Sequence, residues 1–363
     1  MEDSLSQGIP SPSRPLTESA ITPDRPIAFT VVPSPTHHDP THPEHPRRVH
    51  GLAEAAAEAF GDSLLSVPAP AADEDDVLAV HPPSHLDFLR RACAQAPAII
   101  DYAPTYVSPD SFDCALRAAG GTLEVLRAVL DGRAESGFAA VRPPGHHATP
   151  GQAMGFCLLN NMAIAVRAAQ RLGCPKVMIV DFDVHHGNGT QETFEADPSV
   201  LYVSTHQQGI YPGTGRLEER GVGAAQGFNV NLPLPANAGD EAFGQIAAAF
   251  LHPLALRFAP DMLLVSAGYD AHWRDPLANL QLTTTGFHRL SQSLVEIARR
   301  HCGGRALFVL EGGYDPAVVR EGVLASIASM TGQAVPYDRL GPAPVPPADV
   351  AHVLRAAQVL HGL

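Results

Sequence analysis

Four short polar segments, far apart in the chain, each follow directly on an apolar run, and this pattern constrains the fold most strongly. They are Arg142–His147, Asp181–Gly189, Ser266–Asp270 and Glu311–Tyr314. The apolar runs alternate with amphipathic helical patterns, which indicates a parallel sheet covered by helices on both faces. In such sheets ligands bind beyond the carboxyl ends of the strands, so we expect all four segments on one rim.

Strand and helix patterns alternate along most of the chain. Apolar runs predict strands at 27–32, 137–141, 176–180, 200–204, 262–265 and 306–310. Helical periodicity predicts helices at about 48–60, 84–95, 112–134, 160–172, 240–257, 286–301, 315–331 and 348–361, and residues 206–227 predict a long Gly-rich loop. Residues 1–26 are rich in Ser, Pro and Thr and predict a disordered leader. We therefore expect one domain over 27–363 with a helical tail at about 348–361.

Composition and charge argue against several classes of protein. The formal net charge of −14 argues against a nucleic-acid-binding surface. Five scattered cysteines without a Cys-x-x-Cys pair fit free thiols in a reducing compartment. We find neither a signal peptide nor a long apolar stretch, so the sequence predicts a cytoplasmic protein that does not enter a membrane. Whether the chain forms a homo-oligomer stays open.

The second polar segment has the spacing of a metal site. Asp181, Asp183 and His185 alternate with period two, so their side chains share one face if the segment stays extended. Asp270 is the best candidate for a third ligand, because it ends another apolar strand. Two carboxylates and one His leave a coordination position open for water, as in catalytic sites, and they suit Zn²⁺, with Fe²⁺ or Co²⁺ as chemical alternatives. Asp-x-Asp alone would more often belong to a structural turn.

The first polar segment contains a pair of histidines that suits acid–base catalysis. His146 and His147 follow Pro143-Pro144-Gly145, a rigid turn that fixes their direction. Asp181 is free to orient the His146 ring. We then expect His147 to face the attacking water as general base and later as general acid.

Aromatic residues in Gly-rich segments suggest the rest of the pocket. Tyr314 follows a Gly-Gly pair after a strand, and its phenol could donate to an oxyanion, although a packing role is the default for such a Tyr. Phe156, after Gly155, and Tyr211 lie in Gly-rich loops. They form either two walls of a narrow apolar slot or ordinary loop packing.

Together these segments resemble the histone deacetylase family of zinc amidohydrolases. The resemblance runs from about Ile27 to about Gln333 and includes the segments 142–148, 155–161, 181–191, 266–270 and 311–314. It implies an arginase/deacetylase-like three-layer α/β fold, with a central, mostly parallel sheet and helices on both faces. The compact chain looks like the bacterial or organellar members that are called histone deacetylase-like.

The resemblance also implies a role for each residue of the site. The zinc ligands would be Asp183, His185 and Asp270. The catalytic groups would be His147 as general acid and base, His146 backed by Asp181, and Tyr314 on the scissile carbonyl. The residues at the acyl-lysine tunnel or its mouth would be Gly155, Phe156, Tyr211, Leu277 and Gly312.

Members of this family also carry structural monovalent cations, K⁺ or Na⁺. By resemblance, one cation would be bound by Asp181, Asp183, His185, Ser204 and Thr205. A second would be bound mostly by backbone oxygens near Phe194, Asp197, Val200 and Phe228. Arg48 would line an internal channel through which acetate leaves.

Two positions bear on the subtype and on the substrate. Asn188 stands where class I members have Asp, which is typical of class II. Leu277 follows Asp275-Pro276, where one subgroup of acetylpolyamine hydrolases has Glu. The resemblance therefore favours zinc-dependent hydrolysis of acetyl-lysine in proteins or peptides, with release of acetate and the free amine.

Three alternatives remain open. A hydrolase of acetylpolyamines or other small N-acetyl amines would keep the chemistry and change only the rim. An arginase-type ureohydrolase with two Mn²⁺ ions would need further carboxylates and would give Tyr314 no such role. A non-enzymatic binder of acyl-lysine or an acetoin-related regulator would not need the catalytic groups, all of which are present.

Overall fold

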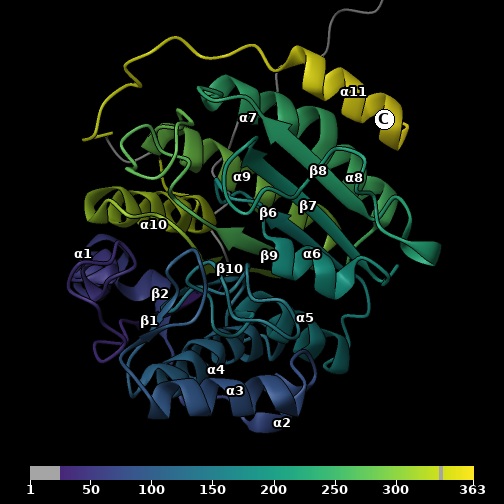
Figure 1. Ribbon diagram of the computed structural model, residues 1–363. Coiled ribbons are helices and arrows are strands. Elements are labelled where there is room, and N and C mark those ends of the chain that lie inside the picture. Colours follow the sequence, from purple (N-terminus) through teal and green to yellow (C-terminus); the bar gives the residue numbers. More distant parts are fainter. Residues whose placement is uncertain (1–24, 335–337) are drawn as a thin grey trace, which may run out of the picture.

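The computed structural model describes residues 25–334 and 338–363, and an eight-stranded sheet lies at its centre (Figure 1). The strand order is β2-β1-β5-β10-β9-β6-β7-β8, and each neighbouring pair is parallel. The bounds are β1 (Ile27–Val32), β2 (Leu64–Ser66), β5 (Gly137–Val141), β6 (Val177–Asp181), β7 (Val200–Gln207), β8 (Asn229–Leu234), β9 (Met262–Ala267) and β10 (Ala306–Leu310). A separate antiparallel pair joins β3 (Ala98–Ile99) and β4 (Tyr106–Val107). The predicted parallel sheet is confirmed.

Helices cover both faces of this sheet, which confirms the three-layer fold (Figure 1). One face carries α2 (Glu74–Leu78), α3 (Pro83–Ala94), α4 (Ser111–Leu130), α5 (Asn161–Arg171) and α6 (Asn188–Phe194). The other carries α1 (Leu52–Phe60), α7 (Asp240–Ile246), α8 (His252–Phe258), α9 (Thr284–His301) and α10 (Pro316–Thr331). Along β5, Phe138 and Ala140 join one apolar core while Ala139 and Val141 join the other, as expected for a strand buried on both faces.

Several elements differ from the sequence prediction, and six of them had no predicted counterpart: β2, β3, β4, β8, α2 and α6. The helix expected over 240–257 is interrupted between α7 and α8 by a π-helical turn, Ala247–Leu251. β8 was not predicted, because its sequence contains two Asn and a Pro, which are poor strand formers. Pro233 is tolerated there because β8 is the last strand in the sheet order. Short 3₁₀ turns at Pro46–Val49, Gly61–Ser63 and Gly223–Ala225 complete the chain.

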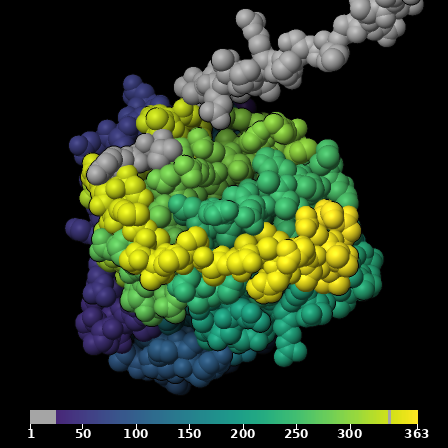
Figure 2. Space-filling model, turned by 90° about the horizontal axis from the view of Figure 1, so that it is seen from above, coloured from purple at the N-terminus to yellow at the C-terminus, as the bar shows by residue number. Residues whose placement is uncertain are grey.

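The two ends of the chain bear on the predicted leader and tail. The leader, residues 1–26, lies outside the described residues except for Arg25 and Pro26, and the Pro26 carbonyl accepts a hydrogen bond from Glu135. The tail contains α11 (Ala351–His361), as predicted. Figure 2 shows this C-terminal segment, in yellow, lying across one face of the molecule. Among the described residues, the helices are all too short or too polar to span a bilayer.

The topology places the four polar segments together. β5, β10, β9 and β6 are consecutive neighbours in the sheet, and each of them leads into one of the segments. Because these strands are parallel, their carboxyl ends share one edge. The register pairs Asp181 with Ser266 and Leu310 with Ala267. The expectation that all four segments lie on one rim is confirmed.

Candidate metal and acid–base site

Three buried side chains from two neighbouring strand ends meet at this rim. Asp183 and His185 follow β6, and Asp270 follows β9, which is paired with β6. One potential ligand atom from each residue lies within 4.8 Å of the other two. His185 Nδ1 is 3.1 Å from Asp183 Oδ1 and 3.2 Å from Asp270 Oδ2. This mixed set of oxygen and nitrogen donors fits a single Zn²⁺ with an open position.

The electrostatics of the three side chains also fit a cation. Asp270 Oδ2 is buried, close to His185, yet makes no hydrogen bond. Burial and the neighbouring Asp183 carboxylate raise the pKa of Asp270. Burial lowers the pKa of His185, but the two carboxylates outweigh it and raise that pKa to about 10. A dication between these groups would replace the imidazolium proton and satisfy both buried carboxylates.

Two glycines leave the space that the carboxylates occupy. A Cβ on Gly268 would lie 2.0 Å from Asp183 Oδ2, and a Cβ on Gly312 would lie 2.0 Å from Asp270 Oδ2. The Gly312 N–H also donates to Asp183 Oδ2 at 2.7 Å. The structure thus places Gly312 directly behind the candidate ligands.

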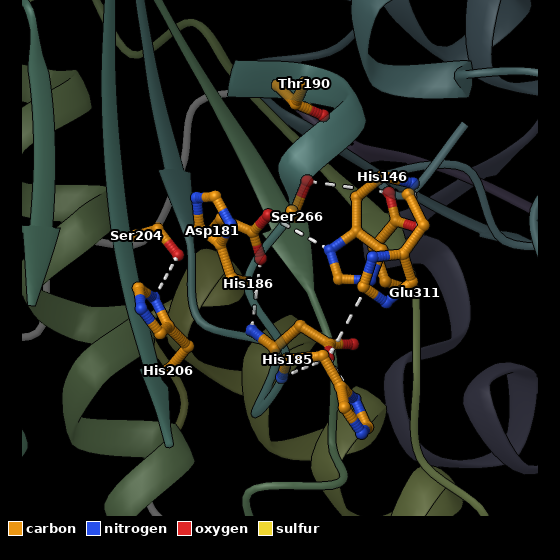
Figure 3. A network of polar contacts seen from close by, with 12 residues as sticks. His146, Asp181, His185, His186, Thr190, Ser204, His206, Ser266 and Glu311 are labelled. Carbon is orange, nitrogen blue, oxygen red and sulfur yellow. Dashed lines mark hydrogen bonds and ion pairs between the residues drawn. The ribbon is translucent and has the colours of Figure 1, made fainter. Parts of the chain in front are cut away.

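His146 is held by a buried carboxylate, as the sequence predicts. Its Nδ1 donates to Asp181 Oδ2 at 3.1 Å (Figure 3), and the Tyr202 hydroxyl donates to the same oxygen at 3.0 Å. Burial lowers the pKa of His146, but the Asp183 and Asp181 carboxylates outweigh it and raise that pKa to about 10. Tyr202 was not among the predicted site residues, because its role depends on pairing between β6 and β7.

His147 has a different environment from His146. Its Nδ1 donates to the Asn188 side-chain oxygen at 2.8 Å, which leaves Nε2 as the nitrogen with a free lone pair. Burial, then the neighbouring His146 and His185, lower the pKa of His147 well below its usual value. His147 is therefore neutral at neutral pH, as a general base must be.

A carboxylate from the fourth segment fixes the turn that carries both histidines. Glu311 Oε2 accepts hydrogen bonds from the Gly145 and His146 backbone N–H groups at 2.7 and 3.1 Å. Burial raises the pKa of Glu311 to about 7. The sequence showed Glu311 at a strand end but gave no sign that it holds the His-His turn. Figure 3 shows the carboxylate beside His146.

Tyr314 lies at the same rim with its ring largely buried. The ring is edge-on to Phe156, with centroids 5.7 Å apart, and the Arg48 guanidinium lies over it at 5.0 Å. Asp275 Oδ2 accepts a hydrogen bond from the Tyr314 backbone N–H at 2.7 Å and so anchors this turn. Burial raises the pKa of Tyr314 well above its usual value, so the phenol stays protonated and can donate.

The two aromatic residues that were predicted as walls contact two different residues of the site. Tyr211 packs edge-on against His147 with centroids 5.0 Å apart, and Phe156 packs against Tyr314. Gly155 precedes Phe156, and a Cβ there would lie 2.5 Å from the His147 ring and 2.8 Å from the Tyr211 ring. Leu277 is 40% exposed, and its N–H donates to Asp275 Oδ1 at 3.0 Å.

Residues of the predicted cation sites surround β6 and β7. Thr205 donates to the Asp181 carbonyl at 3.4 Å, and Ser204 Oγ is 2.9 Å from His206 Nδ1 (Figure 3). At the second site three carbonyls accept backbone hydrogen bonds, those of Phe194, Asp197 and Phe228. Each carbonyl retains a second lone pair. Val200 begins β7 beside them.

A buried charge cluster lies beneath Tyr314. Arg48 donates to the carbonyls of Glu311 and Gly313 and to Glu44, and Glu44 also pairs with Arg142. All three charged side chains are fully buried. The sequence analysis singled out Arg48 alone, because 98 residues separate Glu44 from Arg142.

Comparison with known proteins decides the family. A family model described as "Histone deacetylase domain" matches residues 42–330. The chain belongs to the histone deacetylase family. It is 39% identical to the chloroplastic histone deacetylase 14 of Arabidopsis thaliana over 328 residues, which cover 85% of this chain and 78% of that one.

Prokaryotic relatives and a solved structure agree with this. A probable deacetylase of Archaeoglobus fulgidus is 41% identical over 306 residues, covering 83% of this chain and 80% of the relative. The histone deacetylase-like amidohydrolase of Pseudomonas aeruginosa is 39% identical over 293 residues, covering 80% and 76%. The crystal structure of the HDA15 HD domain superimposes with a TM-score of 0.82 at 33% identity, covering 93% of this chain and 94% of that one. The histone deacetylase fold and an amide-hydrolysing activity on acetylated substrates follow for this chain.

Proposed function

We propose that the chain is a zinc-dependent lysine deacetylase, which hydrolyses the acetyl or acyl amide of lysine in proteins or peptides. The proposal is carried by one observation, the meeting of Asp183, His185 and Asp270 within 4.8 Å of one another beside His147. Among residues 25–334 and 338–363 this is the one such cluster, whereas a two-metal ureohydrolase would need further carboxylates.

Asp183, His185 and Asp270 would hold the zinc ion. When bound, the ion supplies a Lewis acid for the scissile carbonyl and lowers the pKa of water from about 16 to roughly 7. Gly268 and Gly312 keep the space beside the carboxylates clear.

The remaining residues of the site manage protons and charge. His147 Nε2 takes a proton from the attacking water, and Asn188 keeps that nitrogen unprotonated beforehand. Tyr314 donates a hydrogen bond to the oxyanion as the carbonyl carbon becomes tetrahedral. His147 then passes its proton to the leaving lysine nitrogen, and the C–N bond breaks to give acetate and the amine.

The rim supports an acyl-lysine substrate over a polyamine. Tyr211 packs against His147 and Phe156 packs against Tyr314, as the walls of a narrow apolar slot would. Leu277 at the exposed rim adds no carboxylate that would attract a second ammonium group. Three relatives described above carry deacetylase in their names, and one is described as an amidohydrolase. Structural K⁺ or Na⁺ near Asp181 and Phe228 belongs to the same proposal.

Side-by-side hydrolysis of an acetyl-lysine peptide and N-acetylputrescine by the zinc-loaded protein tests the substrate class. We expect the larger kcat/KM for the peptide. A larger value for N-acetylputrescine would reassign the chain to small acetylated amines while leaving the chemistry in place. Hydrolysis of neither substrate, at one zinc per chain, would contradict the enzyme assignment.

A further inference from the structure

A second pocket lies at the opposite end of the sheet from the candidate metal site. Its volume is about 590 Å³, within the range of sites for small organic ligands. Three of its lining residues come just before strands begin: Lys176 before β6, Pro198 before β7 and Phe228 before β8. α8 and the end of α11 supply other walls, and Figure 1 shows these two helices beside β8, away from the rim of the site.

The charge lining this pocket is entirely positive. Its ionisable lining residues are Lys176, Arg220, Arg257 and His361, without an acidic side chain among them. Arg257 donates to the His361 carbonyl at 2.8 Å, and Lys176 donates to the Phe258 carbonyl. Both acceptors are neutral, so these hydrogen bonds leave the two positive charges uncompensated.

Buried donors in the pocket lack partners within the described part of the chain. His361 is 5% exposed, and neither of its ring nitrogens has a hydrogen-bond partner. The buried Arg220 Nε is also without one. Burial, followed by Arg220 and Arg257, lowers the pKa of His361 to about 4, so the ring is a neutral donor. Buried polar groups in folded proteins are nearly always satisfied, which points to a ligand that accepts hydrogen bonds here.

The remaining walls of the pocket are apolar. Phe228 and Phe258 meet edge-on with ring centroids 5.7 Å apart, and Leu201 and Leu254 lie beside them. An inorganic ion would leave most of this volume and these aromatic faces without contacts. The backbone oxygen of Phe228 belongs to a predicted cation site, but the pocket itself presents cationic side chains and therefore selects anions.

We propose that this pocket binds a small phosphate monoester with an apolar or aromatic body. The phosphate accepts hydrogen bonds from the Arg220 and Arg257 guanidinium groups, whose geometry matches phosphate oxygens, and from the neutral His361 ring, while Lys176 adds a third positive charge to the pocket. The body of the ligand packs on Phe228 and Phe258. This site is independent of the deacetylase assignment.

Calorimetric titration of the full chain with phenyl phosphate tests the proposal. We expect saturable binding that weakens as salt rises, and tighter binding than that of inorganic phosphate. Arg220→Gln and Lys176→Met should each weaken binding on the order of tenfold. Arg355→Gln, which removes the same charge from an exposed position on α11, should leave it unchanged.

Arg220→Gln removes a guanidinium whose Nε has no partner, so its unfolding midpoint without ligand should match that of the parent chain. If Arg220→Gln fails to fold, binding to Lys176→Met tests the pocket in its place. Absence of binding to the parent chain at millimolar phenyl phosphate would overturn the proposal. Equal binding by the parent and both pocket variants would do the same, and equal affinity for inorganic phosphate would overturn the class of ligand.

Discussion

At the scale of single residues, adjacent histidines have opposite electrostatic roles. His146 donates to a buried carboxylate and has a raised pKa, whereas His147 donates to the neutral Asn188 and has a lowered one. The sequence predicted that Asp181 backs His146 and that Asn188 differs from class I. It did not show that Asn188 contacts His147, because the two are 41 positions apart.

Replacing Asn188 by Asp is expected to change the pH dependence of turnover. A carboxylate beside His147 Nδ1 would stabilise the imidazolium and raise its pKa by about 1 unit. Because the base must be neutral, the acidic limb of the kcat/KM profile should move to higher pH by a similar amount. Asn237→Asp adds the same charge at an exposed position and should not move it. An unshifted acidic limb in Asn188→Asp would contradict the role of His147.

Replacing Tyr314 by Phe removes the phenol while keeping the ring against Phe156. We expect turnover on an acetyl-lysine peptide to fall by about 10²-fold or more, the scale of losing one oxyanion donor. The zinc content should stay at one per chain, because Tyr314 is outside the ligand triad. Turnover close to that of the parent enzyme would show that the phenol does not contact the reacting carbonyl.

At the scale of elements, the turns that follow the strands position the candidate ligands, and Gly312 lies in the turn after β10. We expect Gly312→Ala to lower both zinc content and activity, since its Cβ would lie 2.0 Å from Asp270 Oδ2 and 2.5 Å from Asp183 Oδ2. Gly244→Ala is the matched control, because its Cβ meets nothing within 4 Å on a helix. Metal analysis and initial rates on both variants measure the effect. Full zinc content in Gly312→Ala would show that the carboxylates can move aside.

Elements that are buried on both sides were predicted best from the sequence. β5 and β10 were predicted at their observed bounds, because strands buried on both faces are continuous apolar runs. β8 and α6 were missed: β8 is an edge strand with a Pro, and α6 is short and begins inside the Asp-rich segment. The π-helical turn between α7 and α8 has no local signal in an otherwise helical pattern.

At the scale of the whole molecule, the candidate metal site joins neighbouring strands near the centre of the sheet. Removal of the metal should therefore lower global stability, because Asp183 and Asp270 would remain buried without a dication. Free zinc at about 1,000 times its Kd would add roughly 4 kcal/mol to the free energy of unfolding. Thermal unfolding followed by circular dichroism, with and without chelator, measures this. Asp270→Ala should lose zinc and show no zinc-dependent shift.

The site could be predicted as far as local spacing and sheet topology reach. The spacing of two residues between Asp183 and His185 indicated that their side chains share one face. The position of Asp270 after a neighbouring parallel strand indicated that it lies at the same edge, and the three meet in the structure. The supports behind them could not be predicted, because Glu311 contacts Gly145 across 166 residues and Glu44 contacts Arg142 across 98. Contacts at such separations depend on tertiary packing, which leaves no periodic signal in a single sequence.

The most direct test of the account is a zinc titration of the chelated enzyme with initial rates on an acetyl-lysine peptide. If Asp183, His185 and Asp270 hold one catalytic ion, the rate should rise in proportion to added zinc and stop at one equivalent per chain. Full activity in the chelated protein, or a rate that saturates only at two equivalents, would contradict the one-zinc site.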